Sequence, residues 1–258
     1  MLLQLALLPS LVLFIVLWRK DKQDKEPIGL LLKVFFLGAL TIISAVALGS
    51  LGTNALTMVL DSQSMLFIFI DNFILTALIE EGGKYIVLKK ATWKHPAFNY
   101  TFDAVVYAVV ASLGFATFEN ILYVFENGVG TAITRAIISV PGHAMDAVFM
   151  GFYYGIAKQA SVAGDEAGCK KNLVKALIVP TILHGFYDFC LSTPYDIFIL
   201  IFLIFEIIFT IVTIRKFRKL SREDAPIYNP VGQPGPEVDT AVDVTSVSES
   251  EDQETNIP

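Results

Sequence analysis

Ionisable and amide side chains interrupt four long apolar stretches of this sequence. They are Glu80, Glu81 and Lys84 in one stretch, Glu119 and Asn120 in the next, then His143 and Asp146, and finally His184 and Asp188. An ionisable group within a bilayer costs roughly 2.5–3.5 kcal/mol on insertion scales, so each one needs a partner or a function. Because a helical bundle needs far fewer polar groups to fix its packing, we predict a functional polar centre.

The two histidines of this set each have a carboxylate within one helical turn. His184 and Asp188 are four residues apart, and His143 and Asp146 are three apart, so each pair shares a helix face. A carboxylate in this place commonly fixes the tautomer of a histidine that binds metal or acts as a base. The alternative is that these pairs only neutralise each other or hold helices together.

The adjacent glutamates are predicted to have different roles. Side chains of neighbouring residues point about 100° apart on an α-helix, so Glu80 and Glu81 cannot serve one point equally. Lys84 lies one turn further along and can neutralise one of them, which leaves the other for chemistry.

Such a group of residues favours hydrolysis by one of two mechanisms. The donors suffice for a zinc site of three ligands plus a water, with a remaining carboxylate to take a proton from that water. Without metal, a glutamate activates water directly, a histidine assists, and Asn120 or a histidine stabilises the oxyanion. The sequence has no HExxH, GxSxG or Walker motif that would choose between them. The candidate catalytic residues are Glu80, Glu81, Glu119, His143 and His184, with His143 and His184 as candidate metal ligands, and the candidate supporting residues are Lys84, Asn120, Asp146 and Asp188.

Composition predicts that the elements holding these residues are transmembrane helices. The 258 residues are 54% hydrophobic and 17% charged, with a mean hydropathy of +0.61, which disfavours an ordinary soluble domain. Apolar stretches of about 17–25 residues predict an all-α bundle with about seven spans. The expected spans cover residues 2–18, 28–51, 65–88, 102–124, 131–157, 172–190 and 196–214.

The distribution of Lys and Arg predicts the orientation of the spans. With seven spans, 18 of the 19 basic residues fall on one side and only Arg135 falls on the other. Positive residues collect in the cytoplasm, so we expect the N-terminus outside, the C-terminus inside and a multi-pass protein of the cell membrane. The N-terminal stretch resembles a retained helix more than a removed signal peptide. Cys169 and Cys190 then lie near opposite faces, and no disulfide is expected.

The chain divides into four parts by composition. Residues 1–64 form two N-terminal helices, 65–190 a catalytic core, and 191–222 a last helix with a basic flank. Residues 223–258 carry nine acidic groups and no basic one, which predicts a disordered cytoplasmic tail. No concentrated basic face is left for nucleic acid. Asp71 and Glu206 are interpreted as structural, Asp103 as a helix N-terminal acid, and His95 as a surface residue.

The order of the motifs resembles that of the PrsW family of intramembrane proteases. The motifs are Glu80-Glu81-x-x-Lys84, Asp103-Ala-Val-Val-Tyr107 leading to Gly114-Phe115-Ala-Thr-Phe118-Glu119-Asn120, Pro141-Gly142-His143-Ala144, and His184-Gly185-Phe186-Tyr187-Asp188. The likeness runs from about Leu78 to Phe189. A similar order occurs in prenyl-protein (CAAX) endopeptidases and bacteriocin-processing membrane proteases.

The resemblance implies a peptidase that cuts a membrane-anchored protein, typically an anti-sigma factor, on its extracytoplasmic side during regulated intramembrane proteolysis. It implies that Glu80 and Glu81 are the catalytic glutamates, that Glu119, His143 and His184 belong to the same site, and that the enzyme is a metalloprotease, with zinc as the expected ion. Lys84 stands where the prenyl-protein branch usually has arginine, which disfavours a CAAX activity. An ion- or proton-coupled transporter remains the non-enzymatic alternative, because acids and histidines in a bundle also form relays, and a binding protein without catalysis is a third.

Overall fold

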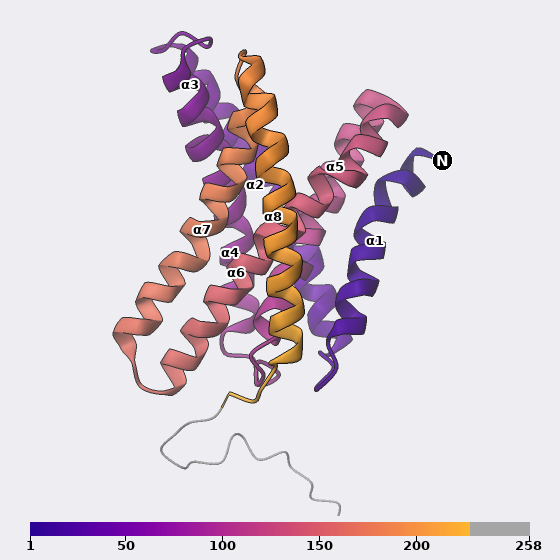
Figure 1. The fold of residues 1–258 in the computed structure, drawn as a ribbon, viewed down its shortest axis with the longest axis vertical. Coiled ribbons are helices and arrows are strands. Elements are labelled where there is room, and N and C mark those ends of the chain that lie inside the picture. Colours follow the sequence, from indigo (N-terminus) through magenta and orange to yellow (C-terminus); the bar gives the residue numbers. More distant parts are fainter. Residues whose placement is uncertain (228–258) are drawn as a thin grey trace, which may run out of the picture.

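The computed structural model describes residues 1–227, which form an all-helical bundle (Figure 1). Its elements are α1 (Leu2–Lys20), α2 (Ile28–Thr57), α3 (Met65–Ile70), the π-helix η1 (Asp71–Ala77), α4 (Leu78–Thr92), α5 (Asp103–Ile137), α6 (Ser139–Val162), α7 (Glu166–Ser192) and α8 (Asp196–Arg222). The expected helical class is confirmed.

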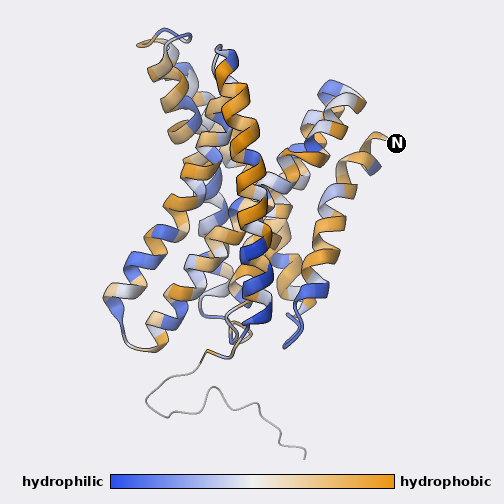
Figure 2. Cartoon of the chain, in the orientation of Figure 1, coloured by the Kyte–Doolittle hydropathy of each residue, from blue (hydrophilic) through white to orange (hydrophobic). Residues whose placement is uncertain are grey.

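Five stretches of the described chain are long and apolar enough to cross a membrane. One of them, Asp103–Val162, contains both α5 and α6. The continuous run α3–η1–α4 is not among the five, in keeping with the charged residues that it carries. Hydrophilic residues gather at the lower ends of α1, α7 and α8 in Figure 2, whereas most of α8 above them is apolar. The chain is therefore a membrane protein, while seven spans and their orientation stay a prediction.

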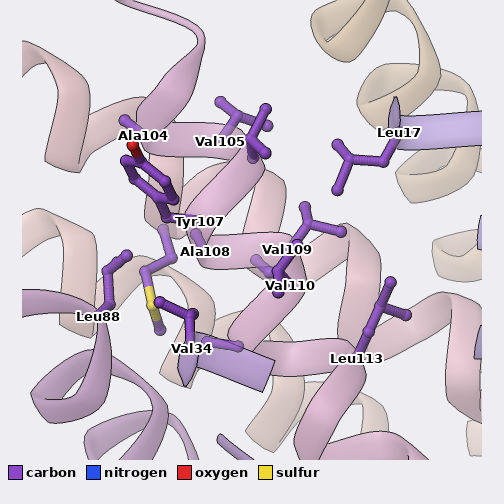
Figure 3. Packing of buried hydrophobic residues seen from close by; sticks show 14 of the residues in the cluster. Leu17, Val34, Leu88, Ala104, Val105, Tyr107, Ala108, Val109, Val110 and Leu113 are labelled. Carbon is purple, nitrogen blue, oxygen red and sulfur yellow. The ribbon is translucent and has the colours of Figure 1, made fainter. Parts of the chain in front are cut away.

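Helix α5 lies at the centre of the bundle. Helices α5 and α6 together form the apolar stretch Asp103–Val162. In the most apolar part of this stretch 78% of the residues are buried, compared with 17% in the most apolar part of α8, so α8 is peripheral. Figure 3 shows side chains of α5 packed among Leu17 of α1, Val34 of α2 and Leu88 of α4. The helix that carries Glu119 is thus fixed on several sides.

Glycines allow α2 and α5 to approach closely. A Cβ at Gly114 would lie 2.0 Å from the carbonyl oxygen of Phe35, and a Cβ at Gly38 would lie 2.1 Å from that of Ala111. Small residues of this kind let membrane helices pack backbone against backbone. The contact holds α5 against α2 one turn before Glu119.

Gly114→Ala is therefore expected to destabilise the bundle. Its methyl group meets backbone rather than a flexible side chain, and overpacking of this kind costs about 1–3 kcal/mol. Thermal unfolding in detergent measures the effect, with Gly130→Ala on the same helix as the control, because nothing lies within 4 Å of a Cβ there. Equal unfolding temperatures for the two variants would contradict the close packing.

The expected loop at residues 125–130 is not formed. Helix α5 runs through this region, and only Gly128 departs from helical geometry, with φ 81°. Glycine adopts a positive φ without steric strain, so the chain bends here while its hydrogen-bonded helix resumes. After the bend, α5 continues to Ile137, and α6 begins at Ser139.

Polar contacts close the end of the bundle opposite this bend. The Oδ2 atom of Asp103 accepts hydrogen bonds from the amides of Asn99 (3.0 Å) and Tyr100 (2.6 Å), so this acid orders the preceding turn as well as beginning α5. The Tyr107 hydroxyl donates to Glu26, which precedes α2. Burial, together with the neighbouring Asp103 carboxyl, raises the pKa of Glu26 to about 9, so Glu26 is protonated at neutral pH.

The predicted boundary of the disordered tail at 223 is wrong by a few residues. The Phe102 amide donates to Asp224 Oδ1 (2.8 Å), and the Ile227 amide donates to the Asn99 carbonyl (2.7 Å). These bonds hold residues 223–227 against the turn before α5. The rest of the tail, 228–258, lies outside the described residues. Cys169 and Cys190 are both free, as expected.

Candidate active site

Four helices bring the predicted polar residues together inside the bundle. Helix α4 supplies the two glutamates and the lysine, α5 supplies Glu119, and α6 and α7 supply one histidine each. The seven-residue π-helix η1 directly precedes α4, and π-helical segments are frequent at functional sites, because the wider turn shifts the register of the next helical residues. Pro180 lies one turn before His184 in α7 and removes a helical hydrogen bond there.

Glu81 is the buried anchor of the cluster. Its Oε1 accepts hydrogen bonds from Lys84 Nζ (2.7 Å) and from His184 Nδ1 (3.0 Å), and the side chains of Glu81 and Lys84 are fully buried. The other ring nitrogen of His184, Nε2, lies 3.1 Å from Asp188 Oδ2. Carboxylates therefore hold His184 on both sides, and the predicted pair of His184 and Asp188 is confirmed.

Glu80 points elsewhere, toward a cavity. Its side chain is 13% exposed, and its Oε2 lies 3.8 Å from His184 Nε2 and 3.9 Å from Lys84 Nζ. These separations exceed hydrogen-bond length, and Oε2 has no hydrogen-bond partner among the described residues. The two glutamates thus differ as their spacing predicted: Lys84 neutralises Glu81, while Glu80 keeps a free oxygen.

His143 is held between Lys84 and Glu119. Lys84 Nζ donates to His143 Nδ1 (3.1 Å), which places the ring proton on Nε2, 2.8 Å from Glu119 Oε2. The same Glu119 oxygen accepts a hydrogen bond from Arg135 (2.5 Å). Arg135 was counted only for topology in the sequence. Arg135 is the one basic residue on the predicted outer side, and this could have marked it as a candidate site residue. Its approach to Glu119, however, depends on the bend at Gly128.

Asn120 and Asp146 make no hydrogen bond to the glutamates or histidines of the cluster among the described residues. The Asn120 amide donates to the Ala6 carbonyl (2.8 Å), and its oxygen accepts from Arg135 (3.1 Å), so both ends are engaged and Asn120 ties α1 to α5. Asp146 makes no hydrogen bond to His143 among the described residues, against the expectation from their spacing. Its buried Oδ1 is without a partner and faces the group around Glu81.

A cavity of about 400 Å³ opens onto this cluster. The site residues that line it are Glu80, Glu119, Arg135, His143, Asp146, His184 and Asp188. A second cavity of about 510 Å³ reaches Glu80 and Glu119 from the side of α2. Glu80 therefore borders space from two directions.

The cluster contains two overlapping sets of potential metal ligands. One oxygen or nitrogen from each of Glu81, His143, Asp146 and His184 lies within 4.8 Å of the others, and the same holds for Glu80, Glu119 and His143. Nitrogen and carboxylate oxygen donors are those that zinc and similar divalent ions use. Buried oxygens of Glu81 and Asp146 without partners also fit such an ion.

The acids and the histidine set aside in the sequence lie apart from these sets. Asp71 accepts a hydrogen bond from Thr53 (2.5 Å). His95 lies in the turn after α4 and accepts from the Ala97 amide (3.2 Å). Glu206 on α8 does not line the cavity of the cluster.

Lys84→Met is expected to destabilise the protein strongly. It removes the cation that contacts Glu81 and leaves that fully buried carboxylate without its main partner. Breaking a buried ion pair in this way costs about 3–5 kcal/mol. Thermal unfolding measures the loss, and the double variant Lys84→Met/Glu81→Gln should recover part of it because the orphaned charge is gone. An unchanged unfolding temperature for Lys84→Met would contradict the pairing.

The fold and the cluster together are those of a helical membrane protein with carboxylates and histidines around an internal cavity. This arrangement is typical of a membrane-embedded hydrolase. A family model described as "PrsW family intramembrane metalloprotease" matches residues 26–214. This match includes α2 and most of α8, so the likeness is wider than the motifs alone indicated. The chain belongs to this family and is a peptidase.

Curated relatives support the same assignment over most of their length. Protease PrsW of Oceanobacillus iheyensis is 35% identical over 211 residues, which cover 82% of this chain and 92% of the relative. Protease PrsW of Bacillus subtilis is 35% identical over 71% of this chain and 79% of the relative. Protease PrsW of Clostridioides difficile is 31% identical over 87% of this chain and 93% of the relative. No solved structure matches the chain.

Proposed function

We propose that this peptidase cleaves a membrane-anchored, anti-sigma-factor-like protein near its extracytoplasmic side, with Glu80 activating the water. The observation that carries the proposal is the free Oε2 of Glu80 at the edge of the 400 Å³ cavity, beside both buried histidines. Family membership favours a peptidase over the transporter alternative.

The geometry supports a distinct role for each residue. Glu80 takes a proton from water as general base and returns it to the leaving amine, because its side chain lines the cavity and its Oε2 has no hydrogen-bond partner among the described residues. Glu81 orients His184 and holds Lys84, and Asp188 secures the other side of His184. His184 and His143 line the cavity, and a ring N–H that leaves its present carboxylate partner can donate to the developing oxyanion.

Glu119 and Arg135 act on His143. The Glu119 carboxylate accepts from His143 Nε2, and Arg135 fixes that carboxylate in turn. Asn120 serves as a link between helices rather than as the oxyanion donor, since both ends of its amide are engaged. Among the alternatives left open by the sequence, the histidines are our candidates for the oxyanion donor, because they line the cavity and Asn120 does not.

A divalent metal, for which zinc is our candidate, fits the residues present. His143 and His184 would hold it together with Glu81 or Asp146, whose buried oxygens lack partners. When bound, such an ion lowers the pKa of its water to about 7 and polarises a carbonyl group. The metal-free alternative also has an observation in its favour, because Lys84 supplies a positive charge to Glu81 and His143 within the same group.

The proposed topology has seven spans, the N-terminus outside and the C-terminus in the cytoplasm, in the cell membrane. It is supported by 18 of the 19 basic residues falling on one side and by the apolar helices that carry the site. The cluster then lies in the outer half of the bilayer, where water and the extracytoplasmic part of a substrate can reach it.

Co-expression with a doubly tagged single-pass anti-sigma factor tests this function. Wild-type protein should convert it to two fragments, and sequencing of the new N-terminus should place the cut near the extracytoplasmic end of its membrane helix. A substrate that stays intact, or a cut on the cytoplasmic side, would contradict the proposal. A prenylated CAAX peptide serves as the second substrate, and its cleavage would favour the prenyl-protein activity instead.

A further inference from the structure

A separate apolar groove of about 270 Å³ lies between α1 and α8, with α5 and α6 as its floor. Val16 of α1, Ile137 of α5 and Ile214 of α8 line it and are 46%, 69% and 43% exposed, so its rim is apolar and open at the surface of the bundle. Figure 1 shows α8 and α1 standing apart with α5 between them. In a membrane protein, such a groove faces the bilayer.

Three polar residues on one face of α8 line this groove. Glu206, Thr210 and Thr213 line it and are spaced four and three residues apart, so they share a helix face. Glu206 Oε2 and Thr213 Oγ1 are buried and have no hydrogen-bond partner among the described residues. An acyl chain offers such atoms nothing, whereas a helix that carries Ser, Thr, Asn or Gln can hydrogen-bond to them. The groove therefore suits a protein helix better than lipid.

The groove lies close to the cavity of the polar cluster. Ile137, Pro141 and Thr210 line the groove, and the residues next to them in the chain, Ile138, Gly142 and Phe209, line the cavity. The two spaces thus adjoin at α6 and α8. A helix seated in the groove would bring one end of itself to Glu80 and the histidines.

We propose that the α1–α8 groove holds the transmembrane helix of the substrate, and that Glu206 and Thr213 select helices with a hydrogen-bonding side chain facing them. The inference rests on the proposed function and adds to it the place where the substrate's membrane anchor binds. It also gives Glu206 a role in binding, in place of the structural role expected from the sequence.

Disulfide cross-linking tests the position of the helix. The two native cysteines are replaced (Cys169→Ser, Cys190→Ala), Glu80→Gln keeps the substrate uncut, and Thr210→Cys provides a thiol in the groove. A tagged single-pass anti-sigma factor carries one cysteine at a time along its membrane helix. Cross-links should form at substrate positions spaced three to four residues apart. The matched control is Ile207→Cys, because Ile207 is 62% exposed on the outer face of α8.

Two results would overturn the groove assignment: no cross-links at Thr210→Cys, or cross-links at Ile207→Cys that are as frequent as those at Thr210→Cys. The first result would mean that lipid, water or a second copy of the chain occupies the groove. The second would mean that the substrate only collides with α8. Glu206→Leu should lower cross-linking at Thr210→Cys, and substitution of the facing polar residue of the substrate by Leu should lower it to the same extent.

A blocked groove separates this inference from the proposed function. Thr210→Trp should slow cleavage of the intact substrate by about tenfold or more, while leaving cleavage of its detached extracytoplasmic segment unchanged. Ile207→Trp should slow neither. If wild-type protein cleaves both substrates and Thr210→Trp slows both equally, or neither, the groove assignment fails and the function stands. If wild-type protein cleaves neither substrate, the proposed function fails and the groove assignment falls with it.

Discussion

Glu80→Gln is expected to lower the rate of substrate cleavage by about 10²–10⁴-fold, the range for loss of a general base. Glutamine has nearly the same shape, so packing around α4 is kept, but an amide cannot accept the proton of water. The Glu80 side chain lines both cavities of the site, and its Oε2 has no hydrogen-bond partner among the described residues. Initial rates of cleavage of the single-pass substrate by purified protein in detergent measure the effect.

The matched control is Asp71→Asn, which neutralises a carboxyl at the start of η1, in the same continuous run of helix. Asp71 is bonded to Thr53 and does not line the catalytic cavity, so its amide variant should cleave at close to the wild-type rate. A rate for Glu80→Gln within about threefold of the control would mean that Glu80 is not the base, and Glu81 would then be the candidate.

His143→Ala and His184→Ala are expected to abolish both stoichiometric metal binding and cleavage. Each removes one of the two imidazoles shared by the set Glu81, His143, Asp146 and His184, and three or four ligands are needed to hold zinc. Metal content of the purified protein is measured by mass spectrometry, and activity is followed before and after a chelator. Readdition of zinc should restore the wild-type protein but neither variant.

The chain provides its own control for this experiment. His95 is the third histidine, and it lies in the turn after α4, so His95→Ala should keep both metal and activity. An active wild-type preparation without metal would contradict the metal site and favour the metal-free glutamate mechanism, in which Lys84 supplies the positive charge.

The residues that build the site could be predicted from the sequence because they follow helical spacing and membrane energetics. The contact between His184 and Asp188, and the different distances of Lys84 from Glu81 and Glu80, depend only on the geometry of one helix. Charge within an apolar stretch is rare enough to mark the residues in advance.

Contacts that depend on how helices are joined could not be predicted in this way. Arg135 reaches Glu119 because α5 bends at Gly128 instead of ending in a loop. Asp146 was expected to pair with His143, but it makes no hydrogen bond to that residue among the described residues. The packing of α6 against α7 brings it close to Glu81 and His184 as well as to His143. Glu206 was visible in the sequence as an acid in an apolar stretch and was interpreted as structural. Its proposed role in the groove depends on how α1 and α8 are placed, which spacing within one helix does not give.

The central claim is that the buried glutamates and histidines are the catalytic centre of this peptidase. The most direct test compares purified wild-type protein with the double variant Glu80→Gln/Glu81→Gln, both reconstituted in lipid with a tagged single-pass anti-sigma factor. Wild-type protein should produce the two fragments, and the folded double variant should produce none. Cleavage by the double variant at a rate comparable with wild type would show that the chemistry occurs elsewhere.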